Sequence, residues 1–213
     1  MLAMSVMRLG AMECRIQLSS PQRFTDGVVY IGTAQQKQKV PIQRSGLGGE
    51  VHYEGESSFL VFESEDAREP IAEVSLPEGG KHFMVALVPL PAEMMVSVVR
   101  DLEKDDLQGG ERMVVNRLPN KIQVELSPVL PMERGAEDNF LAECESVGVL
   151  KVPTFERKLV HFAAMPVVVE QELDGEWKMV TQGRWFHMPQ KKAYVILTPR
   201  EKGRVNLYTV TLN

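Results

Sequence analysis

The sequence predicts an all-β fold of two tandem domains over its 213 residues, and three observations lead to this prediction. Short runs rich in β-branched and aromatic residues recur at intervals of about 8 to 12 residues, bounded by turn residues, as in antiparallel sandwiches and barrels. The periodicity of amphipathic helices is sustained nowhere, which disfavours an α/β fold. The pattern of the first half also recurs, altered, in the second half.

The recurrence is clearest in the last part of each half. Lys81 to Asp101 contains two apolar runs around a break marked by proline, and so does Lys192 to Leu212. The segments that precede them also match, because Phe59 to Leu76 and Val167 to Trp185 each contain a run, an acidic turn and a second run. We therefore interpret the chain as two degenerate copies of one β unit.

The first half contains a series of expected strands. Pro41 indicates an edge strand, since proline cannot donate to a ladder, and the loop Ser45 to Gly49 lacks the spacing of a phosphate-binding loop. The expected strands are Cys14 to Leu18, Val28 to Ile31, Val40 to Gln43, Val51 to Tyr53, Phe59 to Phe62, Ile71 to Leu76 and the two runs within Lys81 to Asp101.

A domain boundary is predicted in Arg100 to Gly110, where apolar content falls, charge rises and two glycines follow. A single helical turn is expected within this segment. The domains are then residues 1–106 and 107–213, each expected to be an immunoglobulin-like antiparallel β-sandwich.

The second half repeats this alternation with one exception. Met132 to Ser146 is acidic and could be a short amphipathic helix or a loop with a helical turn, of which we favour the loop. Asp174-Gly175 predicts a tight hairpin turn. The expected strands are Met113 to Val115, Ile122 to Leu126, Val147 to Val152, Lys158 to Phe162, Val167 to Glu170, Trp177 to Thr181, Arg184 to His187 and the two runs within Lys192 to Leu212.

Composition limits the classes of partner. A hydrophobic content of 44% is enough for a globular core, and a net charge of −5 argues against a nucleic-acid partner. The methionine-rich residues 1–12 contain one basic residue, Arg8, and are too short to span a bilayer. They fit either a truncated export signal or a first strand with a loose tail, so no integral membrane segment is expected.

Reactive side chains occur without the spacing that chemistry requires. The histidines, His52, His82, His161 and His187, lack metal-ligand spacing. Cys14 and Cys144 are expected to be reduced, inert thiols, because Glu143 and Glu145 beside Cys144 suppress its thiolate and two distant cysteines form no disulfide framework. We expect no catalytic residue, no metal site and no cofactor.

Carboxylates gather in two places. Glu63, Glu65, Asp66 and Glu69 share one turn, and Glu103, Asp105 and Asp106 share the boundary segment. Paired carboxylates can hydrolyse glycosides and clustered ones can bind calcium. The Asp-x-Asp-x-Asp-Gly loop is missing, however, so solvated acidic turns are the favoured interpretation.

Three aromatic residues form the candidate partner-binding site: Trp177, Trp185 and Phe186. Strand alternation places Trp177 and Met179 on one face, and Trp185 opposite Phe186. At least one of Trp185 and Phe186 is expected outside the core unless two domains meet there. Core packing is nonetheless the favoured role for such residues, because large aromatic side chains are mostly buried.

Several strand patterns resemble a group of uncharacterised bacterial exported proteins with two tandem β-sandwich repeats. The likeness covers about residues 50–213 and rests on Val51 to Phe62, Ala72 to Pro89, Arg112 to Pro119 and Gly203 to Val210. It implies a periplasmic or extracellular location and no assigned chemistry. The chain departs from this pattern in its poor export signal and its acidic Met132 to Ser146 segment.

The favoured function is a non-enzymatic structural or binding module of the cell envelope that contacts protein or polysaccharide through loops or near Trp185. One alternative is a carbohydrate-active hydrolase that uses carboxylates at the domain junction. The other is an intracellular assembly subunit, which an ordered N-terminal strand would favour. The sequence does not indicate an oligomeric state.

Overall fold

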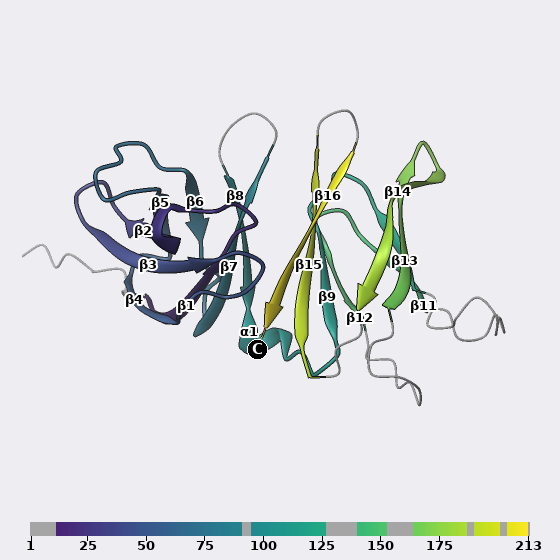
Figure 1. Ribbon diagram of the computed structural model, residues 1–213, viewed down its shortest axis with the longest axis horizontal. Coiled ribbons are helices and arrows are strands. Elements are labelled where there is room, and N and C mark those ends of the chain that lie inside the picture. The colour runs from purple at the N-terminus through teal and green to yellow at the C-terminus, as the bar shows by residue number, and fades with distance from the viewer. Residues whose placement is uncertain are drawn as a thin grey trace, which may run out of the picture. The chain divides into compact units, whose positions relative to one another are not determined.

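The computed structural model of the chain describes residues 12–90, 95–126, 140–152, 164–186, 190–200 and 204–212, and among them the fold is all-β. The strands of the first half are β1 (Met12–Ser19), β2 (Val28–Gly32), β3 (Lys37–Gln43), β4 (Val51–Gly55), β5 (Ser58–Phe62), β6 (Ala72–Ser75), β7 (His82–Pro89) and β8 (Met95–Asp101). Those of the second half are β9 (Arg112–Asn116), β10 (Ile122–Leu126), β11 (Phe140–Cys144), β12 (Val149–Val152), β13 (Ala164–Leu173), β14 (Glu176–Phe186), β15 (Lys192–Pro199) and β16 (Val205–Leu212) (Figure 1). A 3₁₀ turn, η1 (Thr25–Gly27), precedes β2.

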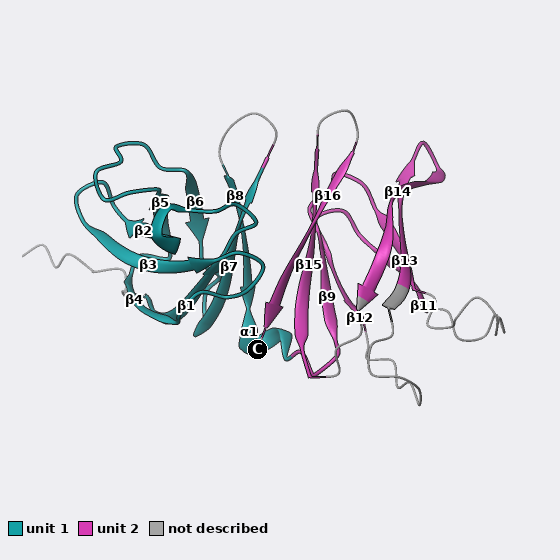
Figure 2. Ribbon diagram, viewed as in Figure 1, with its two compact units in different colours: residues 1–89, 93–106 teal, residues 90–92, 107–213 magenta. Residues whose placement is uncertain are grey.

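The chain forms two compact units, residues 1–89 with 93–106 and residues 90–92 with 107–213 (Figure 2). The helical turn predicted in Arg100 to Gly110 is confirmed as helix α1 (Leu102–Asp105). Asp101 caps this helix, because its carboxylate accepts the N–H groups of Glu103 at 3.1 Å and Lys104 at 3.2 Å. Asp106 follows in the left-handed region and ends it.

The first unit is one eight-stranded sheet that is nearly closed. Its order is β6-β5-β2-β3-β1-β7-β8, and β4 pairs with β1 on the side away from β7. Two contacts close it. Leu18 and Ser19 of β1 pair in parallel with Ile42 and Gln43 of β3. At the other seam, the Met95 N–H donates to the Ile71 carbonyl beside β6 at 2.9 Å.

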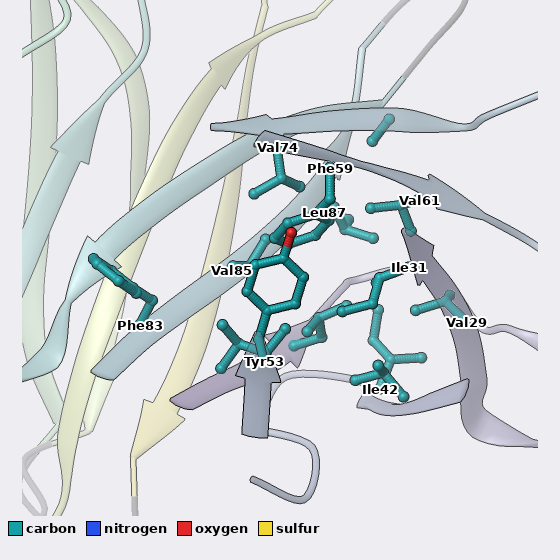
Figure 3. Packing of buried hydrophobic residues seen from close by; sticks show 14 of the residues in the cluster. Val29, Ile31, Ile42, Tyr53, Phe59, Val61, Val74, Phe83, Val85 and Leu87 are labelled. Carbon is teal, nitrogen blue, oxygen red and sulfur yellow. The ribbon is translucent and has the colours of Figure 1, made fainter. Parts of the chain in front are cut away.

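The core of the first unit lies inside this sheet. Alternate residues of each strand point inward, as on β7, where Phe83, Val85 and Leu87 belong to the buried cluster. Figure 3 shows how Tyr53 lies among these side chains, and its ring centroid is 4.9 Å from that of Phe59. The Tyr53 hydroxyl donates to the Glu56 carbonyl at 2.9 Å, which satisfies the polar end of a mostly buried ring.

The described residues of the second unit form two separate four-stranded sheets. Their orders are β11-β10-β13-β14 and β12-β9-β15-β16, and all pairs are antiparallel except β9 with β15. Alternation on β10 buries Ile122, Val124 and Leu126, and alternation on β15 brings Val195 and Leu197 into the same cluster. The two sheets therefore share one core.

Both units share one pairing scheme, to which the first unit adds the pair of β1 with β3. In each, the first strand pairs in parallel with the seventh and antiparallel with the fourth, the seventh and eighth form a hairpin, and the second pairs with the third and the fifth. The predicted equivalences agree with this scheme. Lys81 to Asp101 and Lys192 to Leu212 contain the seventh and eighth strands, while Phe59 to Leu76 and Val167 to Trp185 cover most of the fifth and sixth.

A buried polar side chain at the end of the first strand also occurs in both units. The Ser20 hydroxyl, just after β1, accepts the N–H of Gln22 at 3.2 Å. The Asn116 side-chain oxygen, at the end of β9, accepts the N–H of Leu118 at 3.0 Å. Both polar residues are buried and start the turn toward the second strand.

The prediction of purely antiparallel sheets is wrong. β1 pairs in parallel with β3 and β7, and β9 pairs in parallel with β15. Parallel partners require a long crossover, and here the intervening strands of each unit provide it. Local turn signals reveal hairpins only, so they could not indicate these pairs.

Three further expectations are corrected or refined. Residues 140–144 of the segment expected as a loop form β11, because Phe140, Ala142 and Cys144 alternate with outward residues; residues 132–139 lie outside the described residues. The edge strand predicted from Pro41 is only partly correct. At Pro41, β3 pairs with β2, and from the next residue, Ile42, it also pairs with β1 on its other side. The runs Trp177 to Thr181 and Arg184 to His187 belong to one strand as far as Phe186.

The predicted Asp174-Gly175 turn is confirmed. Both residues have positive φ, 56° and 79°, as the tight two-residue hairpin turn with right-handed twist requires. The expected strand Lys158 to Phe162 and residues 1–11 lie outside the described residues.

Candidate functional site

Trp185 is not available as a partner-binding residue in this structure. It is 8% exposed and packs in the core cluster of the second unit. The Arg112 guanidinium carbon lies 5.4 Å from the centre of the Trp185 ring, within cation–π range. The sequence predicted that Trp185 contacts a partner, whereas the structure places its side chain in the core. The side chain of Phe186 lies outside what the structure describes.

A β-bulge explains why Trp185 points inward and Trp177 outward. Uninterrupted alternation would place both residues on one face, since they are eight positions apart. The register of β13 with β14 shifts between Val169 and Glu170, where Val180 is the extra residue. Val180 packs against the core, so the faces before and after it are exchanged. No local signal in the sequence marks this bulge.

The outer face of the sheet β11-β10-β13-β14 carries the other predicted aromatic residue. Trp177 pairs with Glu172, and Met179 pairs with Glu170. On β13 these two glutamates alternate with the buried Val169 and Gln171, so they and their partners lie on the outer face of the sheet. We call this surface the outer sheet face. Its members are Gln123, Glu125, Leu141, Glu143, Val168, Glu170, Glu172, Trp177, Met179, Gln182 and Arg184.

Large apolar side chains are exposed on the outer sheet face. Met179 is 58% exposed and Leu141 is 59% exposed, and Trp177 is half-buried. Leu141 comes from a segment for which the sequence predicted no strand, so it was missed. Its signal was the alternation of residues 140–144, which the acidic composition obscured.

The outer sheet face is acidic as well as apolar. The carboxylates of Glu125, Glu143, Glu170 and Glu172 outnumber the cationic Arg184 among its members. Lys121, which precedes β10, pairs with Glu143 at 2.8 Å and Glu145 at 3.1 Å, and these carboxylates raise the pKa of the lysine. A partner for this face would be basic and apolar.

Cysteines and histidines take structural positions. Burial raises the pKa of both thiols, Cys14 in the first core and Cys144 in the second, which disfavours the reactive thiolate. His52 lies 3.6 Å from Glu13, and His82 lies 3.1 Å from the Gln17 side-chain oxygen and 3.3 Å from Glu50. His161 and His187 lie outside the described residues.

The acidic turn Glu63 to Glu69 is held by a lysine. The Lys37 ammonium donates to the carbonyls of Glu65 and Ala67, both at 2.6 Å, and lies 4.2 Å from the centre of the Phe62 ring. The carboxylates of Glu63, Glu65, Asp66 and Glu69 are exposed. This turn presents its backbone oxygens to the lysine, and its carboxylates face solvent.

Two carboxylates of the boundary segment, those of Glu103 and Asp105, take part in ion pairs. Glu103 accepts from Arg15 at 3.0 Å, and Asp105 accepts from the Arg100 Nε at 2.8 Å. Within the described parts of the chain, no three His, Cys, Asp or Glu side chains are grouped to hold a metal ion. The arrangement fixes local structure, since each of these carboxylates meets a cation on its own unit.

Comparison with known proteins assigns no family. No protein-family model matches the chain, and no curated protein matches it. Among the residues described, no helix is long and apolar enough to cross a membrane.

Proposed function

We propose that this protein is a non-enzymatic binding module that contacts another protein through its outer sheet face. The observation that carries the proposal is the exposure of Met179 and Leu141 on one face of a sheet that also carries carboxylates. Exposed apolar side chains within a polar surround are typical of protein interaction sites. Trp177, half-buried beside Met179, is the aromatic anchor.

The chemistry of this face favours a basic, apolar protein segment over a polysaccharide. Sugar rings stack on exposed aromatic faces, whereas Trp177 is half-buried and its neighbours are thioether, aliphatic and carboxylate groups. The carboxylates of this face attract Lys and Arg and repel acidic partners.

The tandem immunoglobulin-like identity and the envelope location belong to the same proposal. Two sheets around one core in the second unit, and the shared pairing scheme of both units, support a duplicated sandwich. The envelope location rests on the resemblance of the strand patterns to exported bacterial proteins. Mass spectrometry of the mature N-terminus in the native host tests it, and an uncleaved chain retained in the cytoplasm would favour the intracellular assembly subunit.

The binding proposal is tested by selecting peptides from a displayed random library on the full chain. Peptides rich in Lys, Arg and apolar residues are expected, and their binding should fall at least tenfold with Met179→Lys, by loss of burial and charge reversal. Val147→Lys is the matched control, because Val147 is 60% exposed and lies outside the outer sheet face.

Two results would overturn the proposal. One is a set of selected peptides that bind the Met179→Lys variant as tightly as they bind the wild type. The other is retention on insoluble glycans such as chitin or peptidoglycan that is lost with Trp177→Ala and unaffected by Met179→Lys, which would assign the face to polysaccharide. Release of sugar by the wild-type chain, lost with Glu103→Gln, would support the hydrolase alternative.

A further inference from the structure

Among the described residues, the outer edge of β16 has no strand beside it, and the strand carries no charged side chain. β16 pairs with β15 over all its eight residues, Val205 to Leu212, without a register shift (Figure 1). In the part of the chain that the structure describes, no strand of the second unit pairs with its other edge. The strand contains no charged residue, no proline and no bulge, which are the devices that protect strand edges.

The other edge strands of the second unit do carry such devices. β14 contains Lys178, Arg184 and the bulge at Val180. β11 contains Glu143, and β12 contains Lys151. Among the described edges of this unit, β16 is therefore the one without a charged side chain.

The first unit shows what occupies the equivalent edge. β8, the counterpart of β16, is met by β6 and its flanking residue. The Met95 N–H donates to the Ile71 carbonyl at 2.9 Å, and the Ser97 hydroxyl donates to the Glu73 carbonyl at 2.7 Å. β14, the counterpart of β6, makes no such bond with β16 among the described residues. The occupant that this fold accepts at the eighth strand is thus another β-strand.

We propose that β16 pairs antiparallel with β16 of a second copy of this chain, which joins two four-stranded sheets into one of eight strands. A two-fold axis through the edge closes the assembly, since both copies use the same surface. A strand without charges can face itself without like-charge repulsion. A register centred on Thr209 places Tyr208 opposite the second copy's Val210, an aromatic and β-branched pair that stabilises sheets.

Sedimentation equilibrium of the full chain over a concentration series tests this pairing. The wild type is expected to associate reversibly to a dimer. Thr209→Lys and Thr209→Glu, at an exposed central position of the edge, should each weaken association on the order of tenfold through like charges. An equimolar mixture of the two variants should recover the dimer, because opposite charges then meet, and this recovery excludes misfolding.

Two controls separate this edge from other surfaces. Gln182→Lys adds the same charge to the β14 edge, and Met179→Lys alters the outer sheet face; both should leave association unchanged. A monomeric wild type at every concentration, or Thr209→Lys that associates like the wild type, would overturn the inference. Failure of the two charged variants to associate when mixed would do so too.

Discussion

The two units share one pairing scheme and differ in closure. In the first, β1 pairs with β3 and β6 meets β8, so one sheet surrounds the core. In the second, the equivalent strands make neither connection among the described residues, and two sheets face each other across the core. Pairing order alone therefore does not decide whether an eight-stranded unit closes.

The connection between the third and fourth strands explains one of the two open seams. In the first unit, residues 44–50 connect β3 to β4, and the Ser20 N–H donates to Gln43 at the end of β3 at 3.0 Å. In the second unit, residues 145–148 connect β11 to β12, and the equivalent Asn116 N–H donates to Gly148 within that connection at 2.9 Å. The short turn occupies the place that the third strand occupies in the first unit.

The largest predicted effect concerns Asn116. Its side chain connects the turn after β9 to the connection between β11 and β12, where the second unit lacks the pair of first and third strands. Its side chain accepts from the Leu118 N–H at 3.0 Å and donates to the carbonyls of Asn120 at 3.0 Å and Glu145 at 2.9 Å. Asn116→Ala leaves these groups without partners in a buried site, so we expect a loss of about 3–5 kcal/mol in the free energy of unfolding. Hydrogen exchange of peptides from β9 to β12 measures this loss within the second unit.

The equivalent change in the first unit should cost less. Ser20→Ala removes one hydrogen bond, to the Gln22 N–H, and the expected loss is about 1 kcal/mol. Asn120→Ala is the control within the Asn116 network, because Asn120 takes part through its backbone carbonyl. Equal losses for Asn116→Ala and Ser20→Ala would show that the seam of the second unit does not depend on the asparagine.

The next effect concerns Gly48, which lies at the closed seam of the first unit. Its N–H donates to the Leu18 carbonyl at 2.8 Å, and an added Cβ would overlap the Pro41 carbonyl oxygen and lie 3.1 Å from that of Leu18. Gly48→Ala must push β1 and β3 apart, at an expected cost of about 3 kcal/mol. Urea denaturation with hydrogen exchange in β1 and β3 measures it.

Gly49→Ala is the matched control for this change. The nearest atom to its added Cβ is the Pro41 ring carbon Cγ at 3.2 Å, which can move, so we expect a loss below about 1 kcal/mol. If both alanine variants open β1 and β3 equally, the close approach at Gly48 is not what holds the seam.

Local patterns predicted the parts of this fold that depend on neighbouring residues. The Asp174-Gly175 turn, the helical turn after Asp101 and the equivalence of the paired hairpins all follow from composition over a few residues. The parallel pairing of β1 with β7 was not predicted, because its partners are separated by most of a unit. Such pairing is decided by the packing of the whole unit.

The candidate binding face shows the same limit. The sequence groups Trp177 and Trp185 with Phe186 as one candidate partner-binding site, yet the bulge at Val180 places the two tryptophan rings on opposite faces. A bulge is set by the register with β13, and residues of β14 alone do not reveal it. Leu141 was missed because five alternating residues, Phe140 to Cys144, lie at the end of an acidic stretch.

A smaller effect concerns the connection between the fifth and sixth strands, which differs between the units. Residues 63–71 form a long connection in the first unit, where Lys37 binds the Glu65 and Ala67 carbonyls, while the second unit uses the two-residue Asp174-Gly175 turn. Lys37→Met keeps the aliphatic contact with Phe62 and removes the ammonium. We expect a loss of about 1–2 kcal/mol.

Hydrogen exchange separates a local from a global role of this lysine. Lys37→Met should accelerate exchange in residues 63–71, while Lys39→Met, at an exposed position of the same strand, should leave it unchanged. Uniform acceleration across the first unit would mean that Lys37 stabilises the strand itself and not the connection.

The smallest effect is a pH response at the beginning of the second unit. Burial raises the pKa of the Glu111 carboxyl. The Gln108 N–H at 2.6 Å and the Lys151 ammonium at 2.9 Å lower it by more than burial raises it, so the pKa lies below its ordinary value. A lowered pKa in the folded state adds stability above the unfolded pKa of about 4.3, which is lost as pH falls through the folded value. We expect about 1 kcal/mol or less, since one partly exposed ion pair is involved.

Urea denaturation at pH 7, 5, 4 and 3 measures this response through Glu111→Gln, which removes the titration. The variant should be less stable than the wild type at pH 7, and the difference should disappear toward pH 3, because the wild-type carboxylate is then protonated. Glu78→Gln, at an exposed turn of the first unit, is the control. If the difference in stability between Glu111→Gln and the wild type stays constant with pH, the residue has a packing role. The acid sensitivity of the second unit then comes from other groups.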